Sequence, residues 1–168
     1  ISYVNSIGHA LIDYVELEIG GQAIDRHYGE WMEIWSLLTT SKSKQFGYTD
    51  MIQRYSADSA LGSFLPGKIP GPLTTFTPLQ FWFCRNPGLA LPLIALQYHE
   101  VKVTIEFQKQ AHVGATKDMS NVCLFCDYIF LDTDERRRFA QVSHEYLIEQ
   151  LQTTGTTTFQ NGCKKASV

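Results

Sequence analysis

The sequence is poor in charged residues, which make up only 18% of its 168 residues. Lone soluble domains usually carry a more charged surface, so we expect partners to cover much of this one. The formal net charge is −3, from 14 basic and 17 acidic side chains. Phosphate-binding surfaces need a clustered basic excess, and we therefore predict no direct contact with nucleic acid.

Sorting and processing signals are also missing. The first residues, ISYVNSIGHA, lack the basic segment and long apolar core of a signal peptide. No apolar run reaches the length of a membrane span, and no N-x-S/T sequon is present. The chain begins without Met, so we interpret it as a processed product or a portion of a longer protein.

Cysteines are few and show no disulfide framework. The four are Cys84, Cys123, Cys126 and Cys163, which fits a reducing compartment. Cys123 and Cys126 have the spacing of half a zinc site or a redox pair, but no second CxxC or CxxH follows. Residues three apart in a strand face opposite ways. We therefore expect buried apolar cysteines, with no metal and no cofactor.

Catalytic motifs are absent. The sequence has neither G-x-G-x-x-G nor the Walker pattern. Ser143, His144 and Asp132 could be drawn as a catalytic triad, yet nothing supplies a nucleophile elbow or an oxyanion loop. The five histidines are scattered, and we expect them to make capping or loop hydrogen bonds. We predict that the chain is not an enzyme.

Period-two alternation is the strongest positive signal. In residues 101–108, Val and Ile alternate with Lys, Thr and Glu before an aromatic residue, which predicts a half-buried antiparallel strand. Residues 12–19 alternate in the same way and end at Gly20-Gly21, which predicts a strand and a turn. We also predict strands over 76–84 and 122–132, the latter apolar on both faces and buried on both sides.

Helical spacing occurs once, over 29–40. The apolar residues Trp31, Ile34, Trp35 and Leu38 recur at three and four, which predicts a helix that buries this stripe across an open end of a sheet. The tryptophans could stack a ligand, but core packing is the better interpretation. We expect 41–75 to be a long loop with one helical turn near Met51, because Gly and Pro interrupt it.

The C-terminal part is harder to interpret. Asp132 to Arg138 mixes both charge signs, which suits a loop with ion pairs inside it or across a subunit boundary. Residues 145–152 suit a strand or a helix. Short strands with long loops suggest an antiparallel sandwich of the jelly-roll kind.

Three blocks resemble one family, the major capsid proteins of large icosahedral double-stranded DNA viruses, with the phycodnavirus-like algal and amoebal group closest. The blocks are VELEIGGQAIDRHYGEW at 15–31, PLQFWFCRNPGLALPLIALQYHEVKV at 78–103 and DYIFLDTDERRRFAQVSHEYLIEQLQ at 127–152. The resemblance implies an all-β antiparallel jelly-roll sandwich, partial and first of two tandem rolls, with a short helix and long loops. It also favours a strand over 145–152.

On this resemblance, residues 1–152 are a partial N-terminal jelly roll, and 153–168 are a linker toward a second roll. The family's first three strands would precede Ile1. Without them the sandwich would expose ladder edges and core, so we predict that this chain alone is not a stable monomer.

The function implied is structural: homotrimeric, pseudo-hexameric capsomers in the virion, assembled in the host cytoplasm. Neighbouring capsomers and minor capsid proteins would be partners, in a shell that can overlie an internal viral membrane. The loop 41–75 and the stretch 86–96 are candidate contact segments. The individual candidates are Asn86, Pro87, Leu89, Leu91, Asp132, Asp134, Glu135, Arg136, Arg137 and Arg138. The alternative is a lectin- or cupin-like module that binds a carbohydrate or another ligand.

Overall fold

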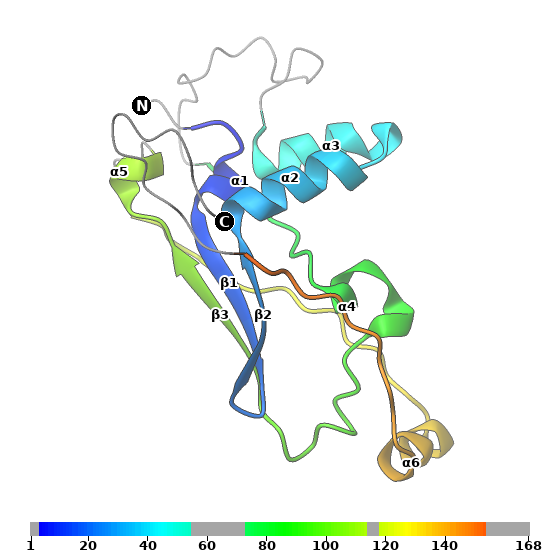
Figure 1. The fold of residues 1–168 in the computed structure, drawn as a ribbon. Helices are drawn as coiled ribbons and strands as arrows, with labels where there is room; N and C mark the ends of the chain where they lie inside the picture. Colours follow the sequence, from blue (N-terminus) through cyan, green and yellow to red (C-terminus); the bar gives the residue numbers. More distant parts are fainter. Residues whose placement is uncertain (1–3, 55–72, 114–117, 154–168) are drawn as a thin grey trace, which may run out of the picture.

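The structure is a computed structural model that describes residues 4–54, 73–113 and 118–153. Its centre is an antiparallel sheet in the order β2-β1-β3 (Figure 1). The strands are β1 (Ile12–Ile19), β2 (Gln22–Tyr28) and β3 (Val101–Phe107). The two strands that alternation predicted most clearly are thus confirmed, and they pair with each other although some ninety residues of sequence separate them.

The β1–β2 hairpin turns at Gly20 and Gly21, as predicted. Both glycines have positive φ, 60° and 80°, the backbone that the tightest two-residue hairpin turns require and that L side chains disfavour. β2 itself was not predicted from the sequence. Its buried positions include Asp25 and His27, so the apolar half of the expected alternation is missing there.

Three helices lie across one end of the sheet (Figure 1): α1 (Ile7–Ala10), α2 (Gly29–Thr39) and α3 (Lys42–Ile52). The backbone at Gly29 comes so close to α1 and β1 that a Cβ there would lie 2.5 Å from the carbonyl oxygens of His9 and Ile12. Only glycine can begin α2 at this place.

The predicted helix over 29–40 is confirmed, but its predicted buried stripe is wrong. α2 buries Met32 and Ser36, whereas Ile34 and Leu38 are exposed, Leu38 to 77%. The small Ser36 faces inward, where its hydroxyl accepts a hydrogen bond from Arg54. The periodicity of apolar residues does not detect a buried helix face that contains a serine.

The expected loop over 41–75 is also corrected. Its first part forms α3, eleven residues that bury Thr49 and Ile52 while Phe46 and Met51 are exposed. Because only Thr49 and Ile52 are buried, no apolar stripe marks this helix in the sequence. The remainder of the expected loop, 55–72, lies outside the described residues.

The predicted strand over 76–84 is wrong as well. The chain runs without regular structure to α4 (Trp82–Arg85), followed by the short 3₁₀ helix η1 (Pro87–Leu89). Phe81 and Trp82 are both buried in one core cluster. A strand would direct these neighbours to opposite faces, and the helical turn allows both to pack inward.

The last difference from the predictions concerns residues 118–153. Neither 122–132 nor 145–152 is a strand, and between them lies α6 (Thr133–Gln141) in place of the expected charged loop. The side chains expected to be buried on both faces of 122–132 are largely exposed, Phe130 to 94%. Within the described residues no strand pairs with either segment, and an unpaired strand has no ladder to hold it.

The main core joins one sheet face to the segment after residue 78. Its members are Ile12, Val15, Leu17, Met32, Phe81 and Trp82. One further short helix, α5 (Gln110–Val113), follows β3. Antiparallel pairing is therefore confirmed, but sheet and helices occur together and the all-β class is not established. Of the helices described, none is long and apolar enough to cross a bilayer.

Candidate subunit-contact site

The candidate contact segment 86–96, here called the ridge, is irregular apart from the 3₁₀ helix η1. Asn86 begins η1, and its side chain accepts a hydrogen bond from the Gly88 amide at 2.9 Å. Such Asx capping replaces a missing helical partner and fixes the turn. Asn86 and Pro87 are exposed, whereas Leu89 and Leu91 are half-buried and pack against the core.

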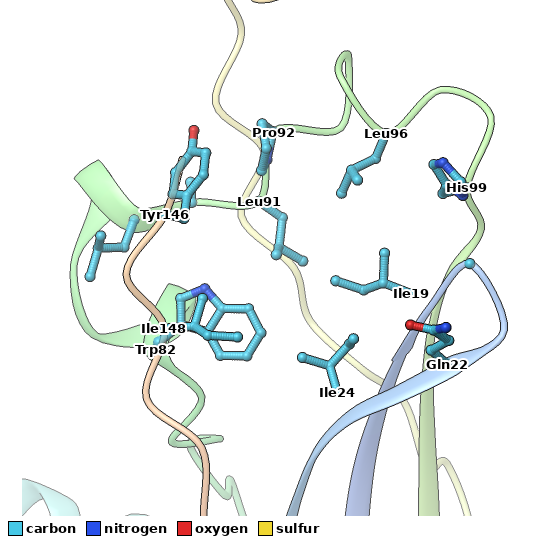
Figure 2. Close-up of a pocket in the computed structure, with 13 residues that line it drawn as sticks. Ile19, Gln22, Ile24, Trp82, Leu91, Pro92, Leu96, His99, Tyr146 and Ile148 are labelled. Atoms are coloured by element: carbon cyan, nitrogen blue, oxygen red, sulfur yellow. The ribbon is translucent and has the colours of Figure 1, made fainter. Parts of the chain in front are cut away.

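The two leucines face an apolar pocket of about 490 Å³ (Figure 2). Its walls come from the β1–β2 hairpin, α4, the ridge and residues of the C-terminal segment. The lining residues labelled in Figure 2 are Ile19, Gln22, Ile24, Trp82, Leu91, Pro92, Leu96, His99, Tyr146 and Ile148. Polar groups are confined to a few side chains such as Gln22 and His99, so the pocket offers burial of apolar surface rather than acid–base chemistry.

His99 closes one corner of this pocket. A Cβ on Gly20 would lie 2.8 Å from the His99 Nδ1 atom, so the imidazole rests on the glycine turn. His99 and Glu100 precede β3 directly. The ring thus contacts the β1–β2 turn at a strand end, whereas a capping or loop hydrogen bond was expected of it.

The second candidate contact region is the helix α6. Asp132 caps it by accepting a hydrogen bond from the Glu135 amide at 2.9 Å. Asp134 and Glu135 lie in the first turn and Arg138 in the last, which is the favourable arrangement for the helix dipole. The charges that suggested a loop are thus helix-end signals, and Asp132 is the signal that sequence reasoning overlooked.

α6 presents its charges to solvent. It stands apart from the sheet and from α1–α3 (Figure 1), and all six predicted contact residues from Asp132 to Arg138 are exposed. Arg137 and Asp134 are 3.7 Å apart, an exposed pair that contributes little to stability. No comparison with known proteins assigns these residues, so their role in subunit contacts stays a prediction.

A cluster around Arg85 connects α4 to its surroundings. Its guanidinium lies 4.1 Å from the centre of the Trp35 ring, a cation–π contact, and 2.5 Å from a carboxylate oxygen of Glu149. Trp35 also packs against Trp31 at 5.7 Å between ring centres. Both tryptophans are half-buried and lie outside the main core cluster, so the core packing predicted for them is wrong.

A polar network joins the three helices at the end of the sheet. Glu33 of α2 accepts from the buried His9 Nδ1 at 2.7 Å, from Ser6 at 3.1 Å and from Arg54 at 2.8 Å. Burial by itself would raise the pKa of the Glu33 carboxyl, but the hydrogen bonds from His9, Arg54 and Ser6 outweigh it and bring the pKa to about 2. The network is built to hold a carboxylate, and it stabilises the packing of α1, α2 and α3.

The cysteine expectation is corrected. Cys84, Cys123 and Cys126 are free and exposed rather than buried, because the segment that carries the latter two lacks a covering layer. Cys163 lies outside the described residues. No group of three or more His, Cys, Asp or Glu side chains gathers as a metal site anywhere in the described ranges.

Four of the five histidines make side-chain polar contacts of two kinds. His112 Nδ1 meets the Gln108 side chain at 3.0 Å, and His144 Nε2 meets the Phe139 carbonyl at 3.1 Å, so loop hydrogen bonds are confirmed for these two. Ser143, His144 and Asp132 do not form a catalytic triad, because His144 bonds to that carbonyl while Asp132 caps α6. His9 and His27 are instead buried beside acids, which the sequence did not indicate.

Comparison with known proteins gives this chain a consistent set of relatives. The major capsid protein of Pyramimonas orientalis virus is 58% identical over 150 residues, 88% of this chain and 37% of that protein. Capsid protein 1 of Acanthamoeba polyphaga mimivirus is 45% identical over 169 residues, 92% of this chain and 28% of that protein. The solved structure described as "PBCV-1 virus capsid, quasi-atomic model" is similar with a TM-score of 0.69 and 39% identity, over 89% of this chain and 36% of that one.

The chain thus spans roughly a third of the length of these relatives. A sequence model of the family described as "Major capsid protein N-terminus" matches residues 1–132, which include the whole sheet, α1 to α5 and the segment up to the cap of α6. This chain belongs to that family of major capsid protein N-termini.

Proposed function

We propose that this chain is part of the major capsid protein of a large double-stranded DNA virus and that its role is to build the capsid shell, without catalysis. The supporting observation is its similarity to a virus capsid chain, at a TM-score of 0.69 over 89% of its residues. A role in a shell also accounts for the low share of charged residues, since subunit interfaces replace solvent over much of such a surface.

In this proposal, residues 1–152 form most of the first of two tandem jelly rolls, and 153–168 lead to the second. The exposed apolar segments 122–132 and 145–152 support it, because such segments are stable as strands only between neighbours. The match covers only 37% and 28% of two of these relatives, so sequence outside the region matched here can supply those neighbours.

Three such subunits would form a pseudo-hexameric capsomer of the virion, assembled in the host cytoplasm next to other capsomers and minor capsid proteins. The proposed contacts are the exposed ridge at Asn86 and Pro87, with Leu89 and Leu91 behind it, and the charged face of α6. Exposed residues of both signs suit complementary pairing between copies, and a capped ridge needs little ordering when it docks.

Sedimentation of the protein expressed from its natural reading frame tests this assembly. Replacing Arg136, Arg137 and Arg138 with Glu leaves α6 capped by Asp132 but reverses its positive charges, and we expect trimers to be lost. The control places Glu at Lys109, which is also exposed and lies outside the candidate contact segments. Unchanged trimers in the arginine variant would dismiss α6 as a contact, whereas electron micrographs without icosahedral particles would dismiss the capsid role.

The lectin- or cupin-like alternative finds less support. A cupin site needs several histidine and acidic ligands on one sheet face, and the described residues bring no such group together. The pocket of Figure 2 is walled by apolar side chains, which suits packing better than sugar hydroxyls. Saturable binding in a glycan or metal titration would revive this alternative.

A further inference from the structure

β2 buries two ionisable side chains on the face that should be apolar. Asp25 and His27 are 5% and 3% exposed, and across the hairpin they pair with Leu17 and Val15, which are fully buried. Placing a carboxylate in such surroundings is unfavourable by several kcal/mol unless donors surround it. The groups that donate hydrogen bonds to Asp25 therefore indicate its structural role.

One of those donors comes from the far end of the described chain. Oδ1 of Asp25 accepts from the Arg26 amide at 2.9 Å and from the Leu151 amide at 3.0 Å. Oδ2 lies 2.9 Å from Nε2 of His27, within ion-pair distance but without hydrogen-bond geometry. The imidazole is itself held by stacking on Phe81, at 4.5 Å between ring centres.

The segment 145–153 depends on such ties. It belongs to no strand among the described residues, and Leu147 is 89% exposed. It passes α4 and reaches β2 at its end (Figure 1), where the Gln150 side chain donates to the Ile24 carbonyl at 2.5 Å. Apolar contact through Tyr146 and Ile148 (Figure 2) is non-directional and tolerates sliding.

We propose that Asp25 is a latch that fixes the register of segment 145–153 on β2. Successive amides of an extended chain point to opposite sides, so a shift by one residue would remove the Leu151 N–H from the buried carboxylate and leave its Oδ1 with the Arg26 amide alone. A shift would also turn the side chains that enter the pocket outward. The latch thus sets which residue of segment 145–153 lies against Asp25.

Hydrogen exchange over 145–150, in the protein expressed from its natural reading frame, tests the latch from both sides. Asp25→Leu removes the acceptor, and Leu151→Pro removes the donor. We expect each to accelerate exchange about ten- to a hundred-fold, the usual worth of a hydrogen bond to a charged group. The double variant should exchange no faster than the faster single variant, because both remove the same bond.

Two variants serve as matched controls. Gln152→Pro removes the neighbouring amide, and Glu16→Gln removes another strand carboxylate, which binds Arg26 rather than the segment; both should stay within about two-fold of the parent. Equal exchange in Gln152→Pro and Leu151→Pro would overturn the proposal, as would independent effects in the double variant. If Asp25→Leu does not fold, the two proline variants decide the matter, because residues 151 and 152 lie outside the core.

Discussion

Two regions of this chain are similarly rich in apolar residues and differ sharply in what surrounds them. In the sheet and its covering helices, Val15 and Leu17 are completely buried, whereas in 118–153 Phe130 and Leu147 are almost completely exposed. β1 finds a partner in β3 within the same chain, while 122–132 and 145–152 pair with no strand in the described ranges. An apolar pattern indicates that a segment can be buried, but its burial also requires a neighbouring strand.

The largest expected effect is on the chain taken alone. The polypeptide of residues 1–168 carries exposed apolar side chains along 122–131 and 145–148, a surface that favours self-association. We expect it to sediment as oligomers at micromolar concentration and to melt without a sharp transition. Glu at Phe125 and Phe130 should reduce the oligomers.

A sharp, reversible melt of a monomer at low concentration would break the comparison, because the second region would then need no neighbour. Glu at the exposed Phe46 of α3 is the matched control, since it changes charge and aromatic content outside the second region.

The same substitution in each region measures the difference directly. In the protein expressed from its natural reading frame, Leu17→Ala should lower the free energy of unfolding by about 2–5 kcal/mol, since it leaves a cavity in a closed core. Leu147 is exposed within this chain, but in the proposed subunit another part of the protein covers it, so Leu147→Ala should there cost about 2 kcal/mol or more. A change below about 0.5 kcal/mol is expected only if the position stays exposed. Urea unfolding gives both values, and a loss above about 2 kcal/mol at Leu147 would show that another part of the protein covers this position.

The sequence predicted elements whose buried face is apolar throughout. β3 alternates along its whole length and β1 does so over residues 14–19, and both strands were located correctly. β2 and α3 were missed because their inner faces contain Asp25 and His27 in one case and Thr49 in the other, side chains whose burial depends on distant partners. Those partners, such as the Leu151 amide, follow from the tertiary fold and from no local pattern.

The candidate contact site was predictable only in part. Exposure of Asn86 and of the charged residues after Asp132 agrees with the expectation from composition. The inward position of Leu89 and Leu91 was not foreseen, since a Pro-rich apolar run gives no periodicity from which a face can be assigned. The helix α6 was missed because an Asp cap, acidic first turn and basic last turn were taken for a loop with ion pairs, although together they are a helix signature.

Acid should affect the stability of the two regions differently, because Glu33 of the first region lies in a hydrogen-bond network whereas Asp134 of the second is exposed. The folded pKa of Glu33 is about 2, below its ordinary 4.5, so the unfolded chain takes up this proton first as the pH falls. The contribution of Glu33 is therefore complete above about pH 5 and is lost progressively between pH 5 and 2. We expect it to be on the order of 1–2 kcal/mol, reduced by solvent screening because part of the side chain is exposed.

Unfolding followed by circular dichroism from pH 7 to 2 measures this contribution. Glu33→Gln should be less stable than the parent at pH 7 and should approach it at pH 2. Asp134→Asn in the second region should not change how stability falls between pH 5 and pH 2, because this side chain is exposed to 92%. Parallel curves for Glu33→Gln and the parent would show that the network of α1, α2 and α3 does not depend on the charge of Glu33.

The smallest effect concerns the one regular element of the second region. α6 buries no residue, so its stability rests on its end signals rather than on packing. Asp132→Ala removes the side chain that accepts from the Glu135 amide and should weaken the helix by about 1 kcal/mol. Asp132→Asn keeps an acceptor oxygen and should retain most of that stability. Amide exchange of Glu135 and Arg136 reports the difference, and equal protection in the alanine variant would mean that neighbouring subunits, not the cap, hold α6 in place.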